Sequence, residues 1–501
     1  MPAQTPAALL LLLLAVREGG APGAEEPLRP PARIGVIGAG IGGTAAAYFL
    51  RQKFGRDVLI DVFERGEVGG RLATLNVDGQ DYEAGGDVIH PQNLHMKHFA
   101  KDLGLSTLQR QFSPLGIYNG DEFVFEESSY YLWNLIKLFW NYGLNPLRMY
   151  IWVQEILDKF MRIYHYQSHD YAFSTNEGLL HALGGASFMQ LLNQTIEEAM
   201  QEAGFSQKFI NETVTAIMRF NYGQGASVSG FVGVISLLGV DPGLWSVEGG
   251  NKLVCSGLLS ASKAQLISGS VLSLEEKTRQ KGRSGDPVKQ YDVTYHSKSG
   301  LTTELYDIVL IATPLQPEIA HIAFHNFSPP IQEFSRHYHQ TVTTLVHGHI
   351  NATFFGYRDP SQFEPSSIFT MENPKLFING IIIVFPVKKS ARKPPLGPPV
   401  WRVFSHNSLT KEQLNLLFSS YDFIEEKNWL AYPKYNSQES VPPIILHDQM
   451  YYLNGIEWLA SAMEMSAIAA KNAVLLAHHH WYKNLDRVDQ EGLHDRLQAE
   501  L

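Results

Sequence analysis

Residues 34–43 read Ile-Gly-Val-Ile-Gly-Ala-Gly-Ile-Gly-Gly, a short apolar strand that runs directly into the pattern Gly38-x-Gly40-x-x-Gly43. In such a turn the first glycine bends the chain tightly, the second lets the backbone approach a pyrophosphate, and the third lets a helix pack on the strand. A helix-compatible run follows over residues 44–53. The stretch therefore predicts an α/β domain that binds a dinucleotide.

A second apolar strand is expected over residues 58–63, and it ends in Glu64. A carboxylate at this position accepts hydrogen bonds from the hydroxyls of a ribose, and it would repel a ribose 2'-phosphate. The spacing thus disfavours NADP and leaves FAD or NAD. Arg65, which follows directly, joins the candidate cofactor ligands.

Two further glycine pairs follow within the next twenty or so residues. Gly70 and Arg71 belong to a Gly-Gly-Arg segment, and Gly85 and Gly86 follow an acidic residue by one position. With the first turn, these segments resemble the flavoprotein amine-oxidase superfamily, whose members bind FAD through a dinucleotide turn, a Gly-Gly-Arg segment and an acidic-x-Gly-Gly stretch. The resemblance implies that the cofactor is FAD.

Segments near the end of the chain fit the same interpretation. A strand is expected over residues 451–453, followed by a turn that contains Glu457 and a small-residue helix over residues 461–477. In the superfamily the start of this helix points free backbone N–H groups at the flavin, which implies a backbone contact at Met463 and a cofactor role for Glu457. The alternative is an alanine-rich helix that serves packing alone.

These scattered segments predict a Rossmann-type FAD-binding domain, discontinuous in sequence, together with a second α+β substrate domain. The expected boundaries are 1–24 for a signal peptide, 32–110, 245–325 and 441–480 for the FAD-binding domain, 111–244 and 326–440 for the substrate domain, and 481–501 for a C-terminal tail.

The composition is that of a large globular enzyme. With 501 residues, 45% hydrophobic and 18% charged, the chain is long enough to bury a sizeable core. Its net charge of −10 gives no overall basic charge that would suggest binding to nucleic acid or to an anionic membrane. Consecutive histidines at positions 478–480 would point in different directions on a helix, so no metal site is expected.

The N-terminus indicates export. Residues 7–16 form an apolar run too short to span a bilayer, followed by small residues, as in a secretory signal peptide, and no transmembrane helix is expected. The only cysteine, Cys255, excludes an internal disulfide. Glycosylation is expected at the asparagines of Asn-x-Ser/Thr sequons, which are Asn193, Asn211, Asn326 and Asn351.

Residues 130–166 are unusually rich in aromatic side chains and predict two helices joined by a turn at Gly143. One interpretation is that these helices line a long apolar pocket or lie on a membrane surface as a peripheral lipid contact. The other is that they form a helical hairpin that buries its aromatic residues in the core of the substrate domain.

The chain also resembles one family within that superfamily, the prenylcysteine lyase family of prenylcysteine oxidases. The resemblance is carried by the first glycine turn and by residues 83–90, 157–168 and 244–258, and it extends over residues 34–501. It implies a lysosomal FAD thioether oxidase that acts on farnesyl- and geranylgeranyl-cysteine during the degradation of prenylated proteins. With O2 and water the products would be the prenyl aldehyde, cysteine and hydrogen peroxide.

A cysteine head group needs an anionic and a cationic partner. Asp87, His90 and Lys252 lie in segments expected near the flavin and are the candidate substrate residues. The alternatives are local hydrogen bonds that shape the loop for Asp87 and His90, and a solvated position for Lys252. The sequence provides no assignment of a catalytic residue.

Two other functions are compatible with the sequence. One is an ordinary flavin amine oxidase, although Ala462 stands where familiar amine oxidases carry an aromatic residue beside the substrate nitrogen. The other is a non-catalytic flavoprotein that binds isoprenoid lipids.

Overall fold

The structure is a computed structural model that describes residues 29–110, 113–240, 243–280, 287–334, 336–392, 397–437 and 440–499. The chain divides into two units, Met1–Pro30 and Pro31–Leu501. The predicted signal peptide, residues 1–24, lies outside the described residues. The fold described below is that of the second unit.

A mostly parallel sheet forms the first layer. Its centre is β1 (Arg33–Ile37), which pairs in parallel with β2 (Leu59–Glu64) on one side and β12 (Ile308–Ile311) on the other. β20 (Met450–Tyr452) pairs in parallel with β12 and so brings the end of the chain beside its start. The outer strands of this sheet are β9 (Gln265–Gln280), β10 (Pro287–Ser297), β11 (Gly300–Tyr306), β13 (Ala323–His325) and β19 (Ile445–His447).

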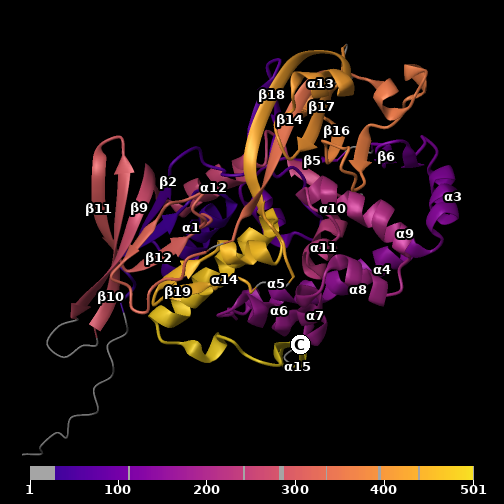
Figure 1. The fold of residues 1–501 in the computed structure, drawn as a ribbon. Coiled ribbons are helices and arrows are strands. Elements are labelled where there is room, and N and C mark those ends of the chain that lie inside the picture. The colour runs from indigo at the N-terminus through magenta and orange to yellow at the C-terminus, as the bar shows by residue number, and fades with distance from the viewer. Residues whose placement is uncertain are drawn as a thin grey trace, which may run out of the picture. The chain divides into compact units, whose positions relative to one another are not determined.

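Three helices pack together beside this sheet (Figure 1). α1 (Ile41–Phe54) follows the glycine turn and packs against both α14 (Met463–Trp481) and α12 (Lys252–Ser262). The contact is close because α1 presents small residues, and residues 45–47, all alanine, are fully buried. A strand, a glycine turn and a helix over a parallel sheet confirm the predicted Rossmann-type domain.

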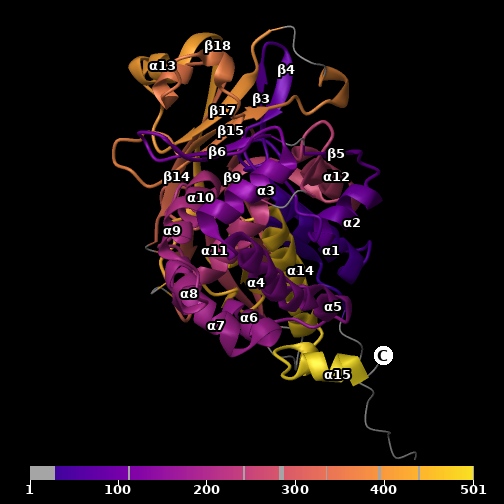
Figure 2. The same ribbon diagram turned by 90° about the vertical axis from the view of Figure 1, so that its right-hand side faces the viewer.

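A second, mixed sheet has the strand order β18-β14-β17-β16-β15-β6-β7. Its longest pair is antiparallel and consists of β14 (Tyr338–Ile350) and β18 (Phe418–Pro433). Figure 2 shows this sheet at the top of the molecule, with a group of helices below it. The other strands are β6 (Leu115–Tyr118), β7 (Phe123–Glu126), β15 (Ser367–Thr370), β16 (Gly380–Val384) and β17 (Val400–Ser405).

The helical group comes from the middle of the first half of the chain. Its members are α3 (Tyr131–Tyr142), α4 (Asn145–Phe160), α5 (Arg162–Ser168), α6 (Asn176–Gly184), α7 (Ala186–Asn193), α8 (Ile196–Glu202), α9 (Gln207–Phe209), α10 (Thr215–Tyr222) and α11 (Gly230–Leu237). Together with the second sheet, these helices make the α+β part of the fold that the sequence predicts.

Shorter elements connect the two sheets or cover their edges. They are α2 (Leu94–Asp102), α13 (Lys411–Leu417), α15 (Leu493–Ala499), β3 (Thr74–Val77), β4 (Gln80–Glu83), β5 (Thr107–Gln109), β8 (Trp245–Val247), the π-helix Ile210–Val214, and the 3₁₀ turns Leu238–Val240, Ala352–Phe355, Pro360–Gln362, Lys389–Ala391, Asn454–Trp458 and Leu485–Arg487.

The aromatic-rich segment folds as predicted into two helices, α3 and α4, with Gly143 closing α3 at φ +59°. The expectation that this hairpin buries its aromatic residues is wrong for α3. Trp140 is 86% exposed and Phe139 is 60% exposed. In the second half of α4 one face is buried, through Val153, Ile156, Leu157 and Phe160, so only part of the segment belongs to the core.

Candidate cofactor site and adjoining cavity

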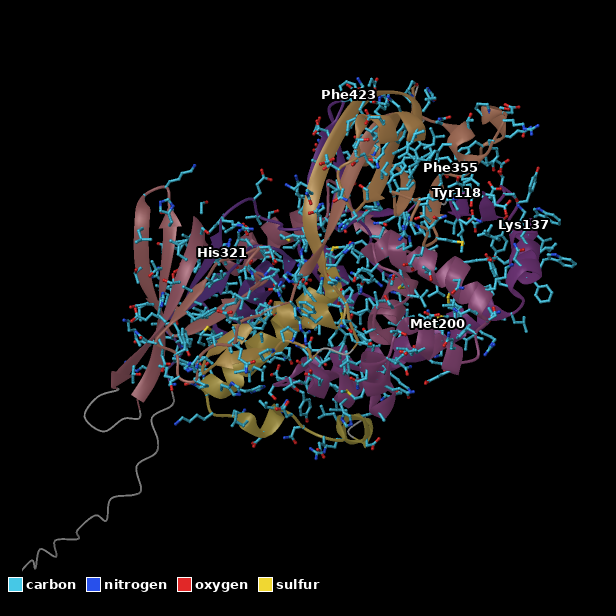
Figure 3. All side chains as sticks on the ribbon, in the orientation of Figure 1. Tyr118, Lys137, Met200, His321, Phe355 and Phe423 are labelled. Atoms are coloured by element: carbon cyan, nitrogen blue, oxygen red, sulfur yellow. The ribbon has the colours of Figure 1, made fainter. Side chains whose placement is uncertain are left out.

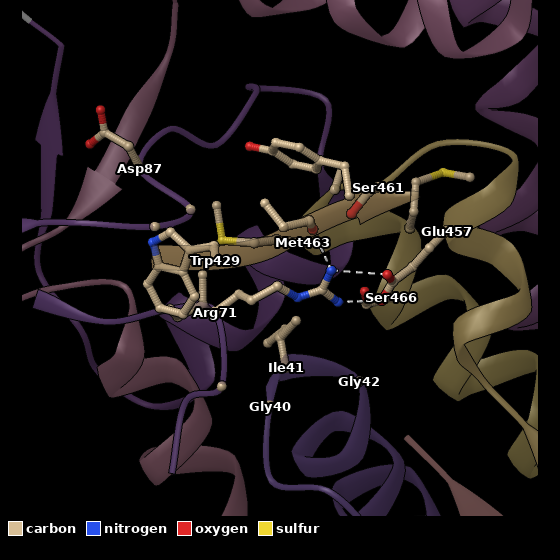
Figure 4. A pocket seen from close by; sticks show the side chains of 18 of the residues that line it. Gly40, Ile41, Gly42, Arg71, Asp87, Trp429, Glu457, Ser461, Met463 and Ser466 are labelled. Carbon is tan, nitrogen blue, oxygen red and sulfur yellow. Dashed lines mark hydrogen bonds and ion pairs between the residues drawn. The ribbon is translucent and has the colours of Figure 1, made fainter. Parts of the chain in front are cut away.

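A cavity of about 750 Å³ runs between the two sheets. Its walls come from the first glycine turn, the Gly-Gly-Arg and Gly-Gly-Asp segments, the start of α14, strands β14, β17 and β18, and the helices α4 and α10. This volume lies in the range of small-molecule and cofactor sites. Figure 4 shows the part of the cavity around Arg71, Trp429 and Met463.

The first glycine turn has the geometry that a pyrophosphate requires. Gly38 has φ +109°, and a Cβ there would lie 2.7 Å from the carbonyl oxygen of Ala312. A Cβ on Gly43 would lie 1.9 Å from the carbonyl oxygen of Gly38, so only glycine lets α1 start this close to β1. Gly40 lines the cavity, and its Cβ position has no atom nearer than the Gly69 oxygen at 3.8 Å. The backbone is therefore open to a ligand at this point.

Glu64 lies at the end of β2, on the cavity wall. Its Oε2 accepts a hydrogen bond from the Ala39 amide at 2.8 Å, and its Oε1 accepts one from the Gly66 amide at 2.8 Å. A carboxylate has about four acceptor sites, so it retains capacity for the hydroxyls of a ribose. Arg65 also lines the cavity, and its Nη1 donates to the Ile319 carbonyl at 2.7 Å.

Arg71 and Glu457 form an ion pair in the cavity wall. Arg71 Nη1 donates to Glu457 Oε2 at 3.0 Å and to the Ala431 carbonyl at 2.7 Å, and Nη2 donates to Glu457 Oε1. Tyr338 and Asn454 also donate to this carboxylate, at 2.8 and 2.7 Å. Burial alone would lower the pKa of Arg71, but the carboxylate beside it raises that pKa above its ordinary value. Both side chains line the cavity and are held by each other (Figure 4).

The start of α14 faces the same cavity. The helix begins at Met463, and residues 461–466 are part of the lining. Ala462 provides no side-chain cap, and the first N–H groups of a helix have no partner within the helix. These N–H groups and the positive end of the helix dipole suit an anionic or electron-rich ligand. This is the position at which the sequence predicts a backbone contact from Met463.

The Gly85-Gly86 segment lies beside the start of α14, and a Cβ on Gly86 would lie 3.7 Å from the Met463 side chain. Both residues line the cavity, and the Gly86 amide donates to the Arg71 carbonyl at 3.1 Å. A Cβ on Gly85 would lie 1.9 Å from the same carbonyl oxygen. Trp429 on β18 closes this side, with Nε1 donating to the Ala84 carbonyl at 3.3 Å.

A charged cluster lies where β17 meets the loop after β4. Arg402, on β17, pairs with Asp87 at 2.6 Å, and Arg402 Nη1 also donates to the Glu83 carbonyl at 3.3 Å. Arg110 lies near the same carboxylate. Burial alone would raise the pKa of Asp87, but Arg402 and Arg110 hold it below its ordinary value. Asp87, Arg110 and Arg402 all line the cavity.

Glu83, directly behind this cluster, is a buried acid. Its Oε1 accepts from the Asn251 amide at 2.6 Å, whereas its Oε2 has no hydrogen-bond partner among the described residues. Burial raises the pKa of Glu83 to about 8. It is therefore largely protonated at neutral pH, so the cluster carries two guanidinium groups against the single carboxylate of Asp87.

The other two candidate substrate residues lie in different surroundings. His90 lines the cavity, and its Nδ1 accepts from the Gln92 amide at 3.1 Å. Lys252, at the start of α12, donates to the Thr74 hydroxyl at 2.7 Å and is not among the cavity-lining residues. The structure thus brings Asp87 and His90 to the cavity and leaves Lys252 behind its wall.

Among the ionisable residues of the cavity wall that the sequence did not indicate are Arg110, Arg402 and Glu464. Glu464, in the first turn of α14, accepts from the amides of His95 and Met96 at 2.7 and 3.0 Å and so caps α2. Burial raises the pKa of Glu464 to about 7. A carboxylate in a first helical turn is a recognisable signal, but nothing in the sequence shows that it caps another helix.

The far end of the cavity is apolar. It is built mainly from the second half of α4, the segment that joins α4 to α5, the end of α10 and α11. The apolar side chains in this part of the lining are Leu157, Phe160, Met161, Phe220, Ile235, Leu238 and Leu244. The cavity therefore combines a nucleotide-like cradle, a charged cluster and an apolar part.

The sequon asparagines lie away from this site. Asn193, Asn211 and Asn326 are exposed. Asn351 is half-buried, with Nδ2 donating to the Leu416 carbonyl at 3.0 Å. Glycosylation of these residues stays a prediction.

The buried acid Glu83 gives a prediction for stability against pH. Because its pKa rises from the ordinary 4.5 to about 8 on folding, folding favours the protonated form. The stabilisation of the folded state by the raised pKa of Glu83 is fully present below about pH 4.5 and is lost as the pH rises toward 8. The wild type should therefore lose more thermal stability between pH 5 and pH 8 than Glu83→Gln, which keeps the acceptor for Asn251. Equal pH slopes of the two melting temperatures would contradict this.

Comparison with known protein families shows the family to which the chain belongs. The sequence profile described as prenylcysteine lyase matches residues 125–490, and a Rossmann-like NAD(P)-binding profile matches residues 36–103. The chain belongs to the prenylcysteine lyase family. This agrees with the resemblance noted from the sequence, and the Rossmann-like match agrees with a bound flavin or nucleotide cofactor.

Relatives within the prenylcysteine lyase family are similar over nearly their whole length. Prenylcysteine oxidase 1 of Bos taurus is 57% identical over 96% of this chain and 95% of its own. Prenylcysteine oxidase 1-like of Mus musculus is 44% identical over 99% of each. Among solved structures, wild-type putrescine oxidase bound to putrescine superposes with a TM-score of 0.58 at 14% identity, over 88% of this chain and 98% of its own. At that identity the superposition shows a shared fold.

Proposed function

We propose that this protein is an FAD-dependent thioether oxidase that cleaves farnesyl- and geranylgeranyl-cysteine with O2 and water to the prenyl aldehyde, cysteine and hydrogen peroxide. The observation that carries the proposal is one cavity that joins a dinucleotide cradle, a cationic cluster and an apolar end. The identity of 57% to a relative named prenylcysteine oxidase 1 supports the same substrate class.

FAD fits the residues at the cradle. The backbone at Gly40 would face the pyrophosphate, Glu64 the ribose hydroxyls, and the N-terminus of α14 at Met463 the flavin ring. Flavin, when bound, supplies a two-electron acceptor that O2 can reoxidise. The chain itself must hold the substrate carbon beside the ring and keep bulk water out of the apolar part of the cavity.

The apolar end matches a prenyl tail. Leu157, Phe160 and Met161 lie on one side of it, and Phe220 lies on another element, stacked on Phe369 with 4.0 Å between ring centroids. A farnesyl tail of about fifteen carbons gains on the order of 10 kcal/mol when it leaves water, at about 0.8 kcal/mol per methylene unit. Burial of the tail is thus sufficient to dominate the selection of substrates.

The cationic cluster matches the carboxylate of a cysteine head group. Arg110 and Arg402 share only Asp87, since Glu83 is largely protonated at neutral pH. The site therefore has an unbalanced positive charge that would attract a carboxylate, while Asp87 remains for the ammonium group. His90 lies on the same wall and completes the polar boundary of the site.

An amine oxidase is the first alternative, because putrescine oxidase shares the fold. Two observations oppose it: Ala462 leaves one wall of an aromatic cage open, and the guanidinium groups of the cavity would repel a cationic amine. A non-catalytic isoprenoid-binding flavoprotein is the second alternative. The anaerobic experiment described next separates all three.

Anaerobic addition of farnesylcysteine to purified, yellow holoprotein should bleach the absorption band of oxidised flavin within one turnover. Spermine and benzylamine at the same concentration should leave the band unchanged. Bleaching by the amines would assign the protein to the amine oxidases, and binding of farnesylcysteine without bleaching would assign it to the non-catalytic class. Protein that folds correctly and takes up no flavin would overturn the proposal altogether.

We further propose that the protein acts in the lysosome, reached through the secretory pathway. The apolar run at residues 7–16 and the four sequons support a lumenal enzyme. With a single cysteine, such an enzyme has no internal disulfide and depends on its core and cofactor for stability. Deglycosylation should increase its mobility on a denaturing gel. Unchanged mobility and cofractionation with cytosolic markers would contradict the proposal.

A further inference from the structure

Helix α3 turns its apolar side chains away from the protein. The exposed fractions are 71% for Leu132, 52% for Trp133, 60% for Phe139 and 86% for Trp140. A helix of a soluble protein does the opposite and faces its apolar stripe toward the core. Neighbouring side chains at the start of α4 continue the same surface, which we call the α3–α4 surface; its members are Tyr130, Tyr131, Leu132, Trp133, Leu135, Ile136, Phe139, Trp140, Leu144, Leu147, Tyr150 and Ile151.

The polar residues of α3 are used on the inner side. Asn134 is buried, and its side chain accepts from the Ser128 amide at 2.7 Å and donates to the Ser128 carbonyl at 2.8 Å. Lys137 donates to the Glu126 carbonyl at 2.9 Å. These bonds fix the orientation of the helix with its apolar side outward. The exposure is therefore built into the local structure.

The charge of this segment is of one sign. No aspartate or glutamate stands between Glu127 and Glu155, whereas Lys137 and Arg148 lie within that stretch. Tryptophan and tyrosine beside lysine and arginine form the composition of surfaces that lie at a membrane–water interface. Anionic headgroups are the complementary charge.

α4 links this surface to the cavity. Its first turns carry exposed Leu147, Tyr150 and Ile151, and its last turn carries Leu157 and Phe160, which line the apolar end of the cavity. Figures 1 and 2 show α3 at the outer edge of the helical group, and Figure 3 shows the side chains around Lys137 projecting outward there. The surface and the apolar end of the cavity are thus opposite ends of one helix.

We infer that the α3–α4 surface docks the protein onto the surface of an anionic lipid bilayer. Its aromatic and aliphatic side chains enter the boundary between headgroups and acyl chains. Lys137 and Arg148 donate to the carbonyls of Glu126, Ala203 and Gly204, and their positive charge beside the surface attracts the anionic headgroups. In the described part of the chain no helix is long and apolar enough to cross a membrane, so the contact is with one leaflet. A second consequence rests on the proposed function: a prenyl tail would pass from the bilayer along α4 to the cavity.

The experiment is flotation of the full-length holoprotein with vesicles of 70% phosphatidylcholine and 30% phosphatidylserine, without substrate. Wild type should float with the vesicles, and the variant Phe139→Ser/Trp140→Ser should partition at least about 30-fold more weakly, because two large side chains no longer enter the lipid. The matched control is Phe423→Ser/Ile424→Ser, which removes exposed apolar side chains from β18 far along the chain. This control should float like the wild type.

Flavin content and melting temperature of both variants should equal those of the wild type, which separates docking from folding. Failure of the wild type to float would overturn the inference. An equal decrease in vesicle binding for the α3 variant and the β18 control would overturn it too. A wild-type dimer in sedimentation velocity that the α3 variant abolishes, with no vesicle binding, would assign the surface to a second copy of this chain. Because the vesicles carry no substrate, vesicle binding is independent of the proposed function. Holoprotein that floats with the vesicles but is not bleached by farnesylcysteine in the separate anaerobic experiment would sink the proposed function and leave the docking intact.

Discussion

The variant Arg71→Met is expected to lower the free energy of unfolding by about 3 to 5 kcal/mol, the usual cost of removing one partner of a buried ion pair. Glu457 is 1% exposed and would keep only Tyr338 and Asn454 as donors. Because Arg71 also lines the cavity, the variant should be purified with less bound flavin. Urea titration and the ratio of flavin to protein absorption measure the two effects.

Two controls make this expectation sharp. Lys375→Gln breaks an exposed pair with Asp121, whose side chains are 74% and 72% exposed, and should cost at most about 1 kcal/mol. The double variant Arg71→Met/Glu457→Met should be more stable than Arg71→Met, because it leaves no uncompensated buried charge. If Arg71→Met unfolds at the same urea concentration as Lys375→Gln, the ion pair does not hold the site together.

The variant Arg110→Gln is expected to lower kcat/KM for farnesylcysteine by about 10- to 100-fold, the equivalent of one lost charge-assisted hydrogen bond. Most of the change should appear in KM, because Arg110 binds the head group and not the reacting carbon. Arg110 is preferable to Arg402 for this test, because Arg402 still neutralises Asp87 at 2.6 Å. Steady-state peroxide release gives both constants.

The methyl ester of farnesylcysteine is the matched substrate for this variant. It lacks the negative charge that Arg110 is proposed to bind, so the wild type and Arg110→Gln should oxidise it with similar kcat/KM. If kcat/KM of the variant falls by the same factor for the acid and for the ester, Arg110 shapes the cavity without binding the carboxylate. An unchanged kcat/KM for the acid would place the head group elsewhere.

The first sheet could be predicted because its signals are local. Gly38, Gly40 and Gly43 lie within six residues, and the backbone conformations that they permit are those that the structure shows. Glu64 could be placed in the same way, since a strand end defines where it lies. The contact at Met463, in contrast, was implied by the resemblance to the flavoprotein superfamily.

The charged cluster could not be predicted, because it forms between distant parts of the chain. Arg402 and Asp87 are 315 residues apart, and the alternating pattern of a strand does not show which of its residues will face a loop from the other sheet. Lys252 was expected near the flavin because of the segment in which it lies. Its side chain instead donates to the Thr74 hydroxyl. Likewise, the apolar pattern of α3 predicted a helix without showing that its hydrophobic side stays uncovered.

The pairing of β12 with β20 and the contact of α1 with α14 have a consequence for biosynthesis. Gly40 is made early and Met463 late, so the two walls of the cradle leave the ribosome more than four hundred residues apart. Nascent chains must keep the edge of β12 open until residues 450–452 arrive. On the proposed function, capture of the flavin is therefore expected after translation, and a polypeptide that stops before β20 is expected to lack a complete cofactor site.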